Sequence, residues 1–236
     1  QDPEYERLQP AIEEVLHALE RGELREEVNR ILLAQMATMH ALNARYDLLV
    51  WESDIVRAGL LQKALALLEQ SPHVFRPREG KYAGALVMDA SPVIPGLEDP
   101  FFVLLRSNGT ATYYAKDIAF QFWKMGILEG LRFRPYENPY YPGLRTSAPE
   151  GEAYTPKAEE TINVIDVRQS HPQALVRAAL ALAGYPALAE KAHHLAYETV
   201  LLEGRQMSGR KGLAGSADEV LAEAVVFWTS PPWMLR

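Results

Sequence analysis

A loop rich in glycine and cations occupies residues 203–212, with the sequence Glu-Gly-Arg-Gln-Met-Ser-Gly-Arg-Lys-Gly. Glycines let a ligand approach the backbone closely, and Arg205, Arg210 and Lys211 place three positive charges within seven residues. Ser208 adds a hydroxyl group, and the start of the next predicted helix adds the positive end of a dipole. This composition is typical of a polyphosphate-binding loop, although it matches neither the Walker pattern nor the dinucleotide fingerprint. A solvated surface turn is the alternative interpretation.

A tyrosine and a carboxylate form a second candidate site. Tyr113 and Asp117 are four residues apart in a predicted helix, so they share one face. A carboxylate beside a phenol hydroxyl can hold a cationic ligand, above all a guanidinium group met by two parallel hydrogen bonds. The alternative is a surface aspartate paired with Lys116 or Lys124, beside a tyrosine that packs on the core.

Polar residues also follow a predicted strand at 162–167. Gln169 and His171 come just after it, where open parallel α/β sheets bind ligands, so Gln169 can reach a substrate and His171 a nucleotide. The alternative is a loop in which Ser170 and His171 cap the next helix. The pair at 193–194 is the other histidine feature, and it lacks partners at metal-ligand spacing, so we expect no metal site.

Composition restricts the class of protein. The chain has 236 residues, a net charge of −7 and no cysteine, which excludes a disulfide scaffold, a thiolate nucleophile and a cysteine-ligated metal. The acidic balance argues against a broadly basic surface that coats nucleic acid. No run of 18 apolar residues occurs, so we expect a soluble intracellular protein. Because the chain starts at Gln1 and its first methionine is Met36, we also expect a piece of a longer protein.

The periodicity of apolar residues predicts the elements that must position these sites. It predicts helices over the first third of the chain, apart from a short strand at 46–51, and then three strands at 74–75, 83–88 and 101–105. Thr110 or Thr112 is expected to cap a helix that runs to about Gly126. Further on, the pattern alternates between strands and helices, as in a parallel α/β sheet: strand 162–167, helix 171–183, strand 195–202 and a helix from Ser216.

We therefore divide the chain into three segments. Residues 1–70 form a mostly helical segment, residues 71–224 an α/β domain with a long loop at 132–160, and residues 225–236 a divergent tail that does not continue the last helix. The loop is assigned because residues 132–160 are rich in proline, glycine and tyrosine and show no periodicity.

The motifs occur together in an order that resembles the one found in arginyl-tRNA synthetases, a family of class I aminoacyl-tRNA synthetases. The order is Ser-Asn-Gly-Thr at 107–110, Tyr113 and Asp117, Gln169, and Gln-Met-Ser-Gly-Arg-Lys-Gly at 206–212. The resemblance runs from about Tyr46 to Glu223. It implies an α/β fold, the second half of a Rossmann-like class I synthetase catalytic domain with a parallel sheet, preceded by a helical connective segment of the same domain.

The resemblance also implies roles for the residues. Tyr113, Asp117 and Gln169 would bind the substrate arginine, whose carboxylate attacks ATP to form arginyl-adenylate before transfer to tRNA. The loop would act in catalysis through Arg205, Ser208, Arg210 and Lys211. ATP, with its Mg²⁺, would be bound by His171 and by the loop residues Gln206, Met207, Ser208, Gly209 and Arg210. The partners would be arginine, ATP and tRNA, with no membrane, in a cytoplasmic monomer.

The chain departs from the family pattern in ways that leave an alternative open. Gln206 and Gly209 replace both lysines of the family's signature loop, and the His-x-Gly-His motif and the tRNA-binding domains are missing. We therefore expect the isolated chain to be inactive as an arginine–tRNA ligase. The alternative functions are a non-catalytic relative that binds arginine or a nucleotide as a regulatory module, and an adaptor whose first 70 residues bind a partner.

Overall fold

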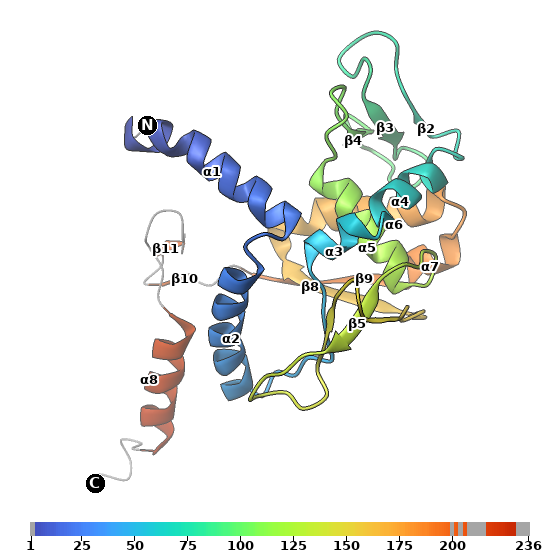
Figure 1. The fold of residues 1–236 in the computed structure, drawn as a ribbon. Coiled ribbons are helices and arrows are strands. Elements are labelled where there is room, and N and C mark those ends of the chain that lie inside the picture. Colours follow the sequence, from blue (N-terminus) through green and yellow to red (C-terminus); the bar gives the residue numbers. More distant parts are fainter. Residues whose placement is uncertain (1–2, 199–200, 203–204, 207–215, 230–236) are drawn as a thin grey trace.

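The computed structural model describes residues 3–198, 201–202, 205–206 and 216–229 (Figure 1). Two helices open the chain, α1 (Pro3–Arg21) and α2 (Arg25–Ala41). They are separated at Gly22, which has a φ of 75°, a conformation that glycine adopts without strain. The predicted helical start is therefore confirmed, including the interruption at this glycine.

A mixed sheet follows, with strand order β1-β6-β5-β7. Its strands are β1 (Leu48–Leu49), β5 (Arg132–Pro135), β6 (Arg145–Ser147) and β7 (Glu152–Ala153). The predicted long loop at 132–160 is thus wrong, because three short strands lie within it. β6 pairs in parallel with β1, nearly a hundred residues earlier, and antiparallel with β5. These strands are too short for a visible alternation, so their pairing partners define them.

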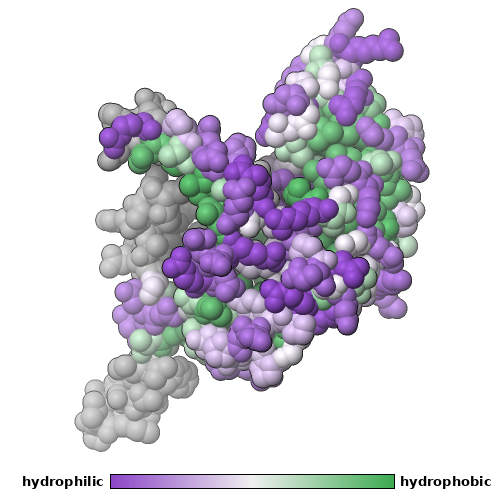
Figure 2. Space-filling model, viewed as in Figure 1, coloured by the Kyte–Doolittle hydropathy of each residue, from purple (hydrophilic) through white to green (hydrophobic). Residues whose placement is uncertain are grey.

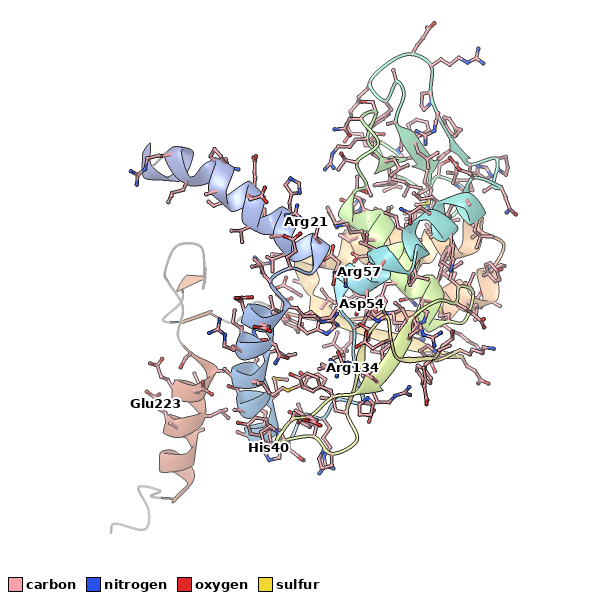
Figure 3. The ribbon with its side chains drawn as sticks, in the orientation of Figure 1. Arg21, His40, Asp54, Arg57, Arg134 and Glu223 are labelled. Atoms are coloured by element: carbon pink, nitrogen blue, oxygen red, sulfur yellow. The ribbon has the colours of Figure 1, made fainter. Side chains whose placement is uncertain are left out.

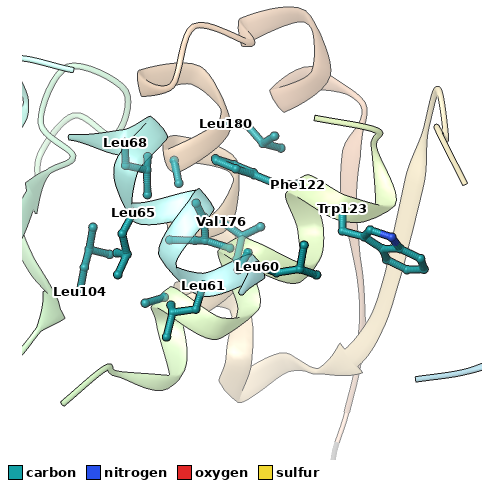
Figure 4. Packing of buried hydrophobic residues seen from close by; sticks show 14 of the residues in the cluster. Leu60, Leu61, Leu65, Leu68, Leu104, Phe122, Trp123, Val176 and Leu180 are labelled. Atoms are coloured by element: carbon teal, nitrogen blue, oxygen red, sulfur yellow. The ribbon is translucent and has the colours of Figure 1, made fainter. Parts of the chain in front are cut away.

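The hydrophobic core lies among three helices and an antiparallel sheet. The sheet is β2-β3-β4, from β2 (Val74–Phe75), β3 (Leu86–Asp89) and β4 (Phe101–Leu105), as predicted. The short helix α3 (Glu52–Arg57) leads into α4 (Leu60–Leu68), which packs on α5 (Tyr113–Lys124), and α5 packs in turn on α6 (Ser170–Leu182). Figure 4 shows Leu65, Phe122 and Val176 from these three helices in one buried cluster.

A parallel pair of strands carries the C-terminal third of the fold. β8 (Thr161–Asp166) pairs in register with β9 (Ala192–Tyr197), and the connection contains η1 (Val167–Gln169), α6 and α7 (Pro186–Glu190). The parallel α/β arrangement is confirmed. The second strand begins three residues earlier than predicted, so His193 and His194 belong to it.

The chain ends in a hairpin and a helix. β10 (Leu201–Leu202) pairs antiparallel with β11 (Arg205–Gln206), and α8 (Ala217–Thr229) follows. Residues 225–229 continue α8, so the expectation that the tail leaves the helix is wrong for that part, and 230–236 lie outside the described residues. No helix in the described part of the chain is long and apolar enough to span a membrane.

Candidate functional site

Helix α5 carries the predicted guanidinium site, and the residue before it anchors the helix to β4. Thr112 precedes the helix but does not cap it through its side chain. Its hydroxyl instead donates to the carbonyl oxygens of Val103, at 2.8 Å, and Leu104, at 3.3 Å. The expected cap is therefore wrong, because a strand carbonyl competes for the same hydroxyl. The result is a start of α5 that is held against β4.

The two residues predicted to bind a guanidinium group lie in the first turns of α5. Tyr113 is 53% exposed, and its ring centroid lies 4.0 Å from that of Tyr114. Local desolvation, followed by the contact with Tyr114, raises the pKa of Tyr113 to about 12, so its phenol keeps its proton at neutral pH. The phenol can thus donate a hydrogen bond to a ligand.

Asp117 offers an open carboxylate on the same helix. The alternative partners are engaged elsewhere: Lys116 Nζ lies 2.6 Å from Glu52, and Lys124 Nζ donates to Asn163 Oδ1 at 2.6 Å. No hydrogen bond or ion pair to the Asp117 carboxylate occurs among the residues that the structure describes. Although this side chain has solvent access, the protein packed around it raises its pKa, and the charge of Lys124 opposes that rise. A cationic ligand would stabilise the carboxylate further.

Gln169 and His171 lie just beyond the carboxyl end of the parallel strand β8, as predicted. Gln169 ends η1 and precedes the first residue of α6, and both side chains are exposed. The His171 ring stands 5.1 Å from that of Phe102 in β4. The Ser170 hydroxyl donates to the Val167 carbonyl, at 2.6 Å, and therefore closes the turn before α6.

Strand β4 brings the two parts of the predicted site to the same end of the core. Thr112 binds the β4 backbone at Val103 and Leu104, while His171 contacts Phe102, the preceding residue of that strand. The first turns of α5 and α6 are thus both adjacent to β4. The residue before Tyr113 and the His171 ring, which are far apart in the sequence, therefore both contact β4.

A buried polar cluster behind Asp117 was not predicted. It joins α5, β8 and α6 through Lys124, Gln121, Asn163, Gln173 and Thr161. Asn163 donates to Gln173 at 2.8 Å and to Gln121 at 3.3 Å, and Gln121 donates to Thr161 Oγ1 at 2.6 Å. Residues 117, 121 and 124 have the spacing of one helix face, which is the sequence signal that could have revealed the cluster.

The predicted phosphate-binding loop lies largely outside the described residues. The backbone of Arg205 and Gln206 forms β11, whereas Met207, Ser208, Gly209, Arg210 and Lys211 fall in the undescribed segment 207–215. The helix after the loop follows Ser216 directly, as predicted, and its first turn carries a cap. The Glu219 amide donates to Ser216 Oγ at 3.1 Å, and the Ser216 amide donates to the Glu219 carboxylate at 3.0 Å. This capping box already satisfies the start of α8, so phosphate binding would depend on the loop cations.

A second group of charges lies between α2, α3 and β6 and was also missed by the sequence analysis. Figure 3 shows Asp54 and Arg57 beside the end of α1, and Figure 2 shows hydrophilic side chains across this part of the surface. Arg25 donates to Asp54 at 2.9 Å and lies over the Trp51 ring, 4.4 Å from its centroid. Arg25 and Trp51 also line an open groove of 1060 Å³. No cluster of three His, Asp or Glu side chains suited to a metal ion occurs among the described residues.

Comparison with known proteins gives close relatives. No protein-family model matches the chain. The chain is 99% identical over 224 residues, 95% of its length, to an arginine–tRNA ligase of Thermus thermophilus, and 50% identical over 228 residues to that of Deinococcus radiodurans. It spans 38% and 37% of those two proteins. A solved structure of Thermus thermophilus arginyl-tRNA synthetase matches 98% of the chain with a TM-score of 0.87 at 92% identity, and 40% of that protein is covered.

These matches agree with the motifs and with the α/β architecture. The sequence identity extends over almost the whole chain, and the solved structure has the same arrangement of elements. The relatives are more than twice as long, so the shared part is a segment of each of them. The chain therefore belongs to the arginyl-tRNA synthetase family, of which it represents part of the class I α/β region.

Proposed function

We propose that this chain supplies the arginine-binding half of an arginine–tRNA ligase. The observation that carries the proposal is the open Asp117 carboxylate beside the protonated Tyr113 phenol, at the end of the core where α6 presents Gln169 and His171. A carboxylate and a neutral phenol match a guanidinium group, because a guanidinium group offers only donors and a fixed positive charge.

The reaction that we propose is the one that membership of the family implies. The substrate's carboxylate oxygen attacks the α-phosphorus of ATP, which forms arginyl-adenylate and releases pyrophosphate. The arginyl group then passes to a terminal ribose hydroxyl of tRNA, and AMP leaves. Tyr113, Asp117 and Gln169 would hold the guanidinium end and so orient the carboxylate, which is catalysis by positioning. His171, with Gln206, Met207, Ser208, Gly209 and Arg210, would bind ATP.

The loop would act on developing charge. Arg205, Ser208, Arg210 and Lys211 would stabilise the phosphate oxygens in the transition state. Mg²⁺ would enter as the ion that ATP carries, and it would neutralise part of the phosphate charge. The complete protein would act as a monomer in the cytoplasm, where tRNA is charged.

The test is Asp117→Asn in the longer Thermus thermophilus relative, at the aligned position. Removing the charge should raise the KM for arginine about 30-fold or more, equivalent to about 2 kcal/mol or more, while the KM for ATP changes less than about 2-fold. The matched control is Glu52→Gln, which removes a nearby carboxylate that binds Lys116 instead. Aminoacylation kinetics measure both constants.

The outcomes of this test distinguish an arginine–tRNA ligase from a non-catalytic module that only binds arginine. An unchanged requirement for arginine in Asp117→Asn contradicts the assigned site. A protein that binds arginine but forms no arginyl-tRNA is the non-catalytic binding module, which is the alternative to a ligase.

A further inference from the structure

A half-buried lysine without a role in the steps above lies at the end of the face that carries Asp117. Lys124 belongs to α5, and its ammonium group donates to Asn163 Oδ1 of β8 at 2.6 Å. Desolvation lowers the pKa of Lys124 to about 8, although the charge of Asp117 opposes this shift. The group can therefore change its charge near neutral pH without a large input of free energy.

The position of this ammonium group is fixed by the polar cluster. Asn163 donates through its amide nitrogen to Gln173 and to Gln121, so its carbonyl oxygen must face Lys124. Gln121 is held in turn by the Thr161 hydroxyl, at 2.6 Å. Three elements thus hold the amine in place, and Lys124 stays close to its partner in both protonation states.

The surrounding charges couple Lys124 to Asp117. The two residues are seven positions apart, which places them on one helix face, and each charge stabilises the other. Lys116 of the same helix and Glu52 of α3 also act on Asp117, with opposite signs, and they pair with each other at 2.6 Å. The groups that the Lys124 ammonium contacts, Asn163 of β8 and the Phe120 ring of α5 at 5.2 Å, do not titrate.

We propose that Lys124 is a positioning residue, a resident counter-ion that balances Asp117 while the site is empty and releases its proton when an arginine guanidinium group binds there. This inference rests on the proposed function, because it takes Asp117 as the arginine-binding carboxylate. The incoming guanidinium neutralises Asp117 and adds a like charge beside Lys124, and both effects favour the neutral amine. The proton passes from Nζ to solvent, and the amine keeps its contact with Asn163.

Proton release makes arginine binding depend on pH. The affinity should increase several-fold as the pH rises from about 6.5 to about 8.5, because less free energy is then needed to deprotonate Lys124. At about pH 7.5, a lysine with a pKa of about 8 is mostly charged, so roughly half a proton or more should leave for each arginine bound.

The experiment is calorimetric titration of arginine into the longer Thermus thermophilus relative, in buffers with different ionisation enthalpies. The slope of the binding enthalpy against the buffer enthalpy gives the number of protons released. Lys124→Met should abolish the release. Lys124→Arg should also abolish it, and should weaken arginine binding several-fold at every pH, because its permanent charge stays beside the incoming guanidinium group.

Lys63→Met is the matched control, because Lys63 lies on α4 and binds the Glu129 carbonyl oxygen. The Lys63→Met protein should release as many protons on binding arginine as the unmodified protein. A folded Lys124→Met or Lys124→Arg protein that still releases the same number of protons overturns the inference. If Asp117→Asn leaves arginine binding unchanged, the proposed function itself fails, which is a separate result.

Discussion

At the scale of the residue, the main feature is a lysine in a partly apolar environment, held by one amide oxygen and by the face of the Phe120 ring. The Lys124 ammonium has Asn163 as its neutral acceptor and Asp117 as its charged neighbour. One hydrogen bond and the contact with the Phe120 ring do not compensate for the lost hydration of the ammonium group, so desolvation dominates and the pKa of Lys124 falls. Part of the free energy of folding is therefore used to bury this charge.

This cost predicts how the stability of the chain depends on pH. The Lys124 pKa is about 8 in the folded state and 10.5 in the unfolded state, so the unfolded chain binds more protons between these values. The contribution of Lys124 to the free energy of unfolding should therefore be lowest below about pH 8 and rise from about pH 8 towards pH 10.5. Urea unfolding of the unmodified chain and of Lys124→Met, at pH values from about 7.5 to 9.5, measures the difference.

The comparison between the two proteins removes contributions from other groups. The pKa of Tyr113 is raised to about 12, so its contribution to the free energy of unfolding falls above about pH 10. That change lies outside the range measured. If the stability difference between the two proteins is constant over this range, Lys124 is not buried as a charged group.

At the scale of the element, a buried carboxylate is one of the groups that join α2 to the rest of the fold, beside the apolar contact of Met36 with Tyr141 and Leu144. Asp54 of α3 has a side chain that is 5% exposed, and it accepts from Arg25 of α2 at 2.9 Å and from Ser147 of β6 at 2.7 Å. Arg25 also donates to the Ser147 carbonyl, at 2.6 Å. Three elements from separate parts of the sequence therefore meet at this group.

Removal of this carboxylate should loosen α2. Asp54→Ala leaves the Arg25 guanidinium and the Ser147 hydroxyl without their acceptor, so we expect a loss of about 2 kcal/mol in the free energy of unfolding. The matched control is Glu150→Ala, which breaks the exposed ion pair with Arg134 at 3.0 Å and should cost less than about 1 kcal/mol. Urea unfolding of both variants compares these costs, and equal losses would mean that Asp54 does not join the elements.

At the scale of the whole molecule, one face of the β8–β9 pair carries apolar side chains that nothing in the described part of the chain covers. Ile162 and Val164 of β8 are 63% and 61% exposed, and Leu195 of β9 is 58% exposed. The opposite face packs on α5 and α6 through Thr161 and Asn163. A parallel pair is usually covered on both faces, so this exposed face is unusual.

The exposed face predicts that the isolated chain binds a hydrophobic dye there. Changing Ile162→Thr and Leu195→Thr together should reduce dye binding and shift the Tm by no more than about 2 °C, because no buried contact is lost and threonine is compatible with strands. Leu180→Thr in the core is the control and should lower the Tm clearly. A large fall in Tm for the double variant would show that the face is already covered.

The sequence by itself determined the elements whose signals are local. The helices α1, α2, α4, α5 and α6 and the strands of the β2-β3-β4 sheet follow from apolar periodicity, because each such pattern is contained within one element. The pairing of Tyr113 with Asp117 on one helix face, and the place of Gln169 after a strand, were likewise predictable from spacing alone. The resemblance to a family depended on these same short motifs.

Tertiary structure alone decided the rest, because the partners are distant in the sequence. The strands at 132–153 exist through pairing with β1, and the Thr112 hydroxyl binds β4 rather than capping α5. That Lys124 makes its hydrogen bond away from Asp117 also depended on β8, since Asn163 binds the ammonium group from 39 residues away. Periodicity records which face of an element is buried, but a hydrogen bond or an ion pair depends on which other element packs against that face.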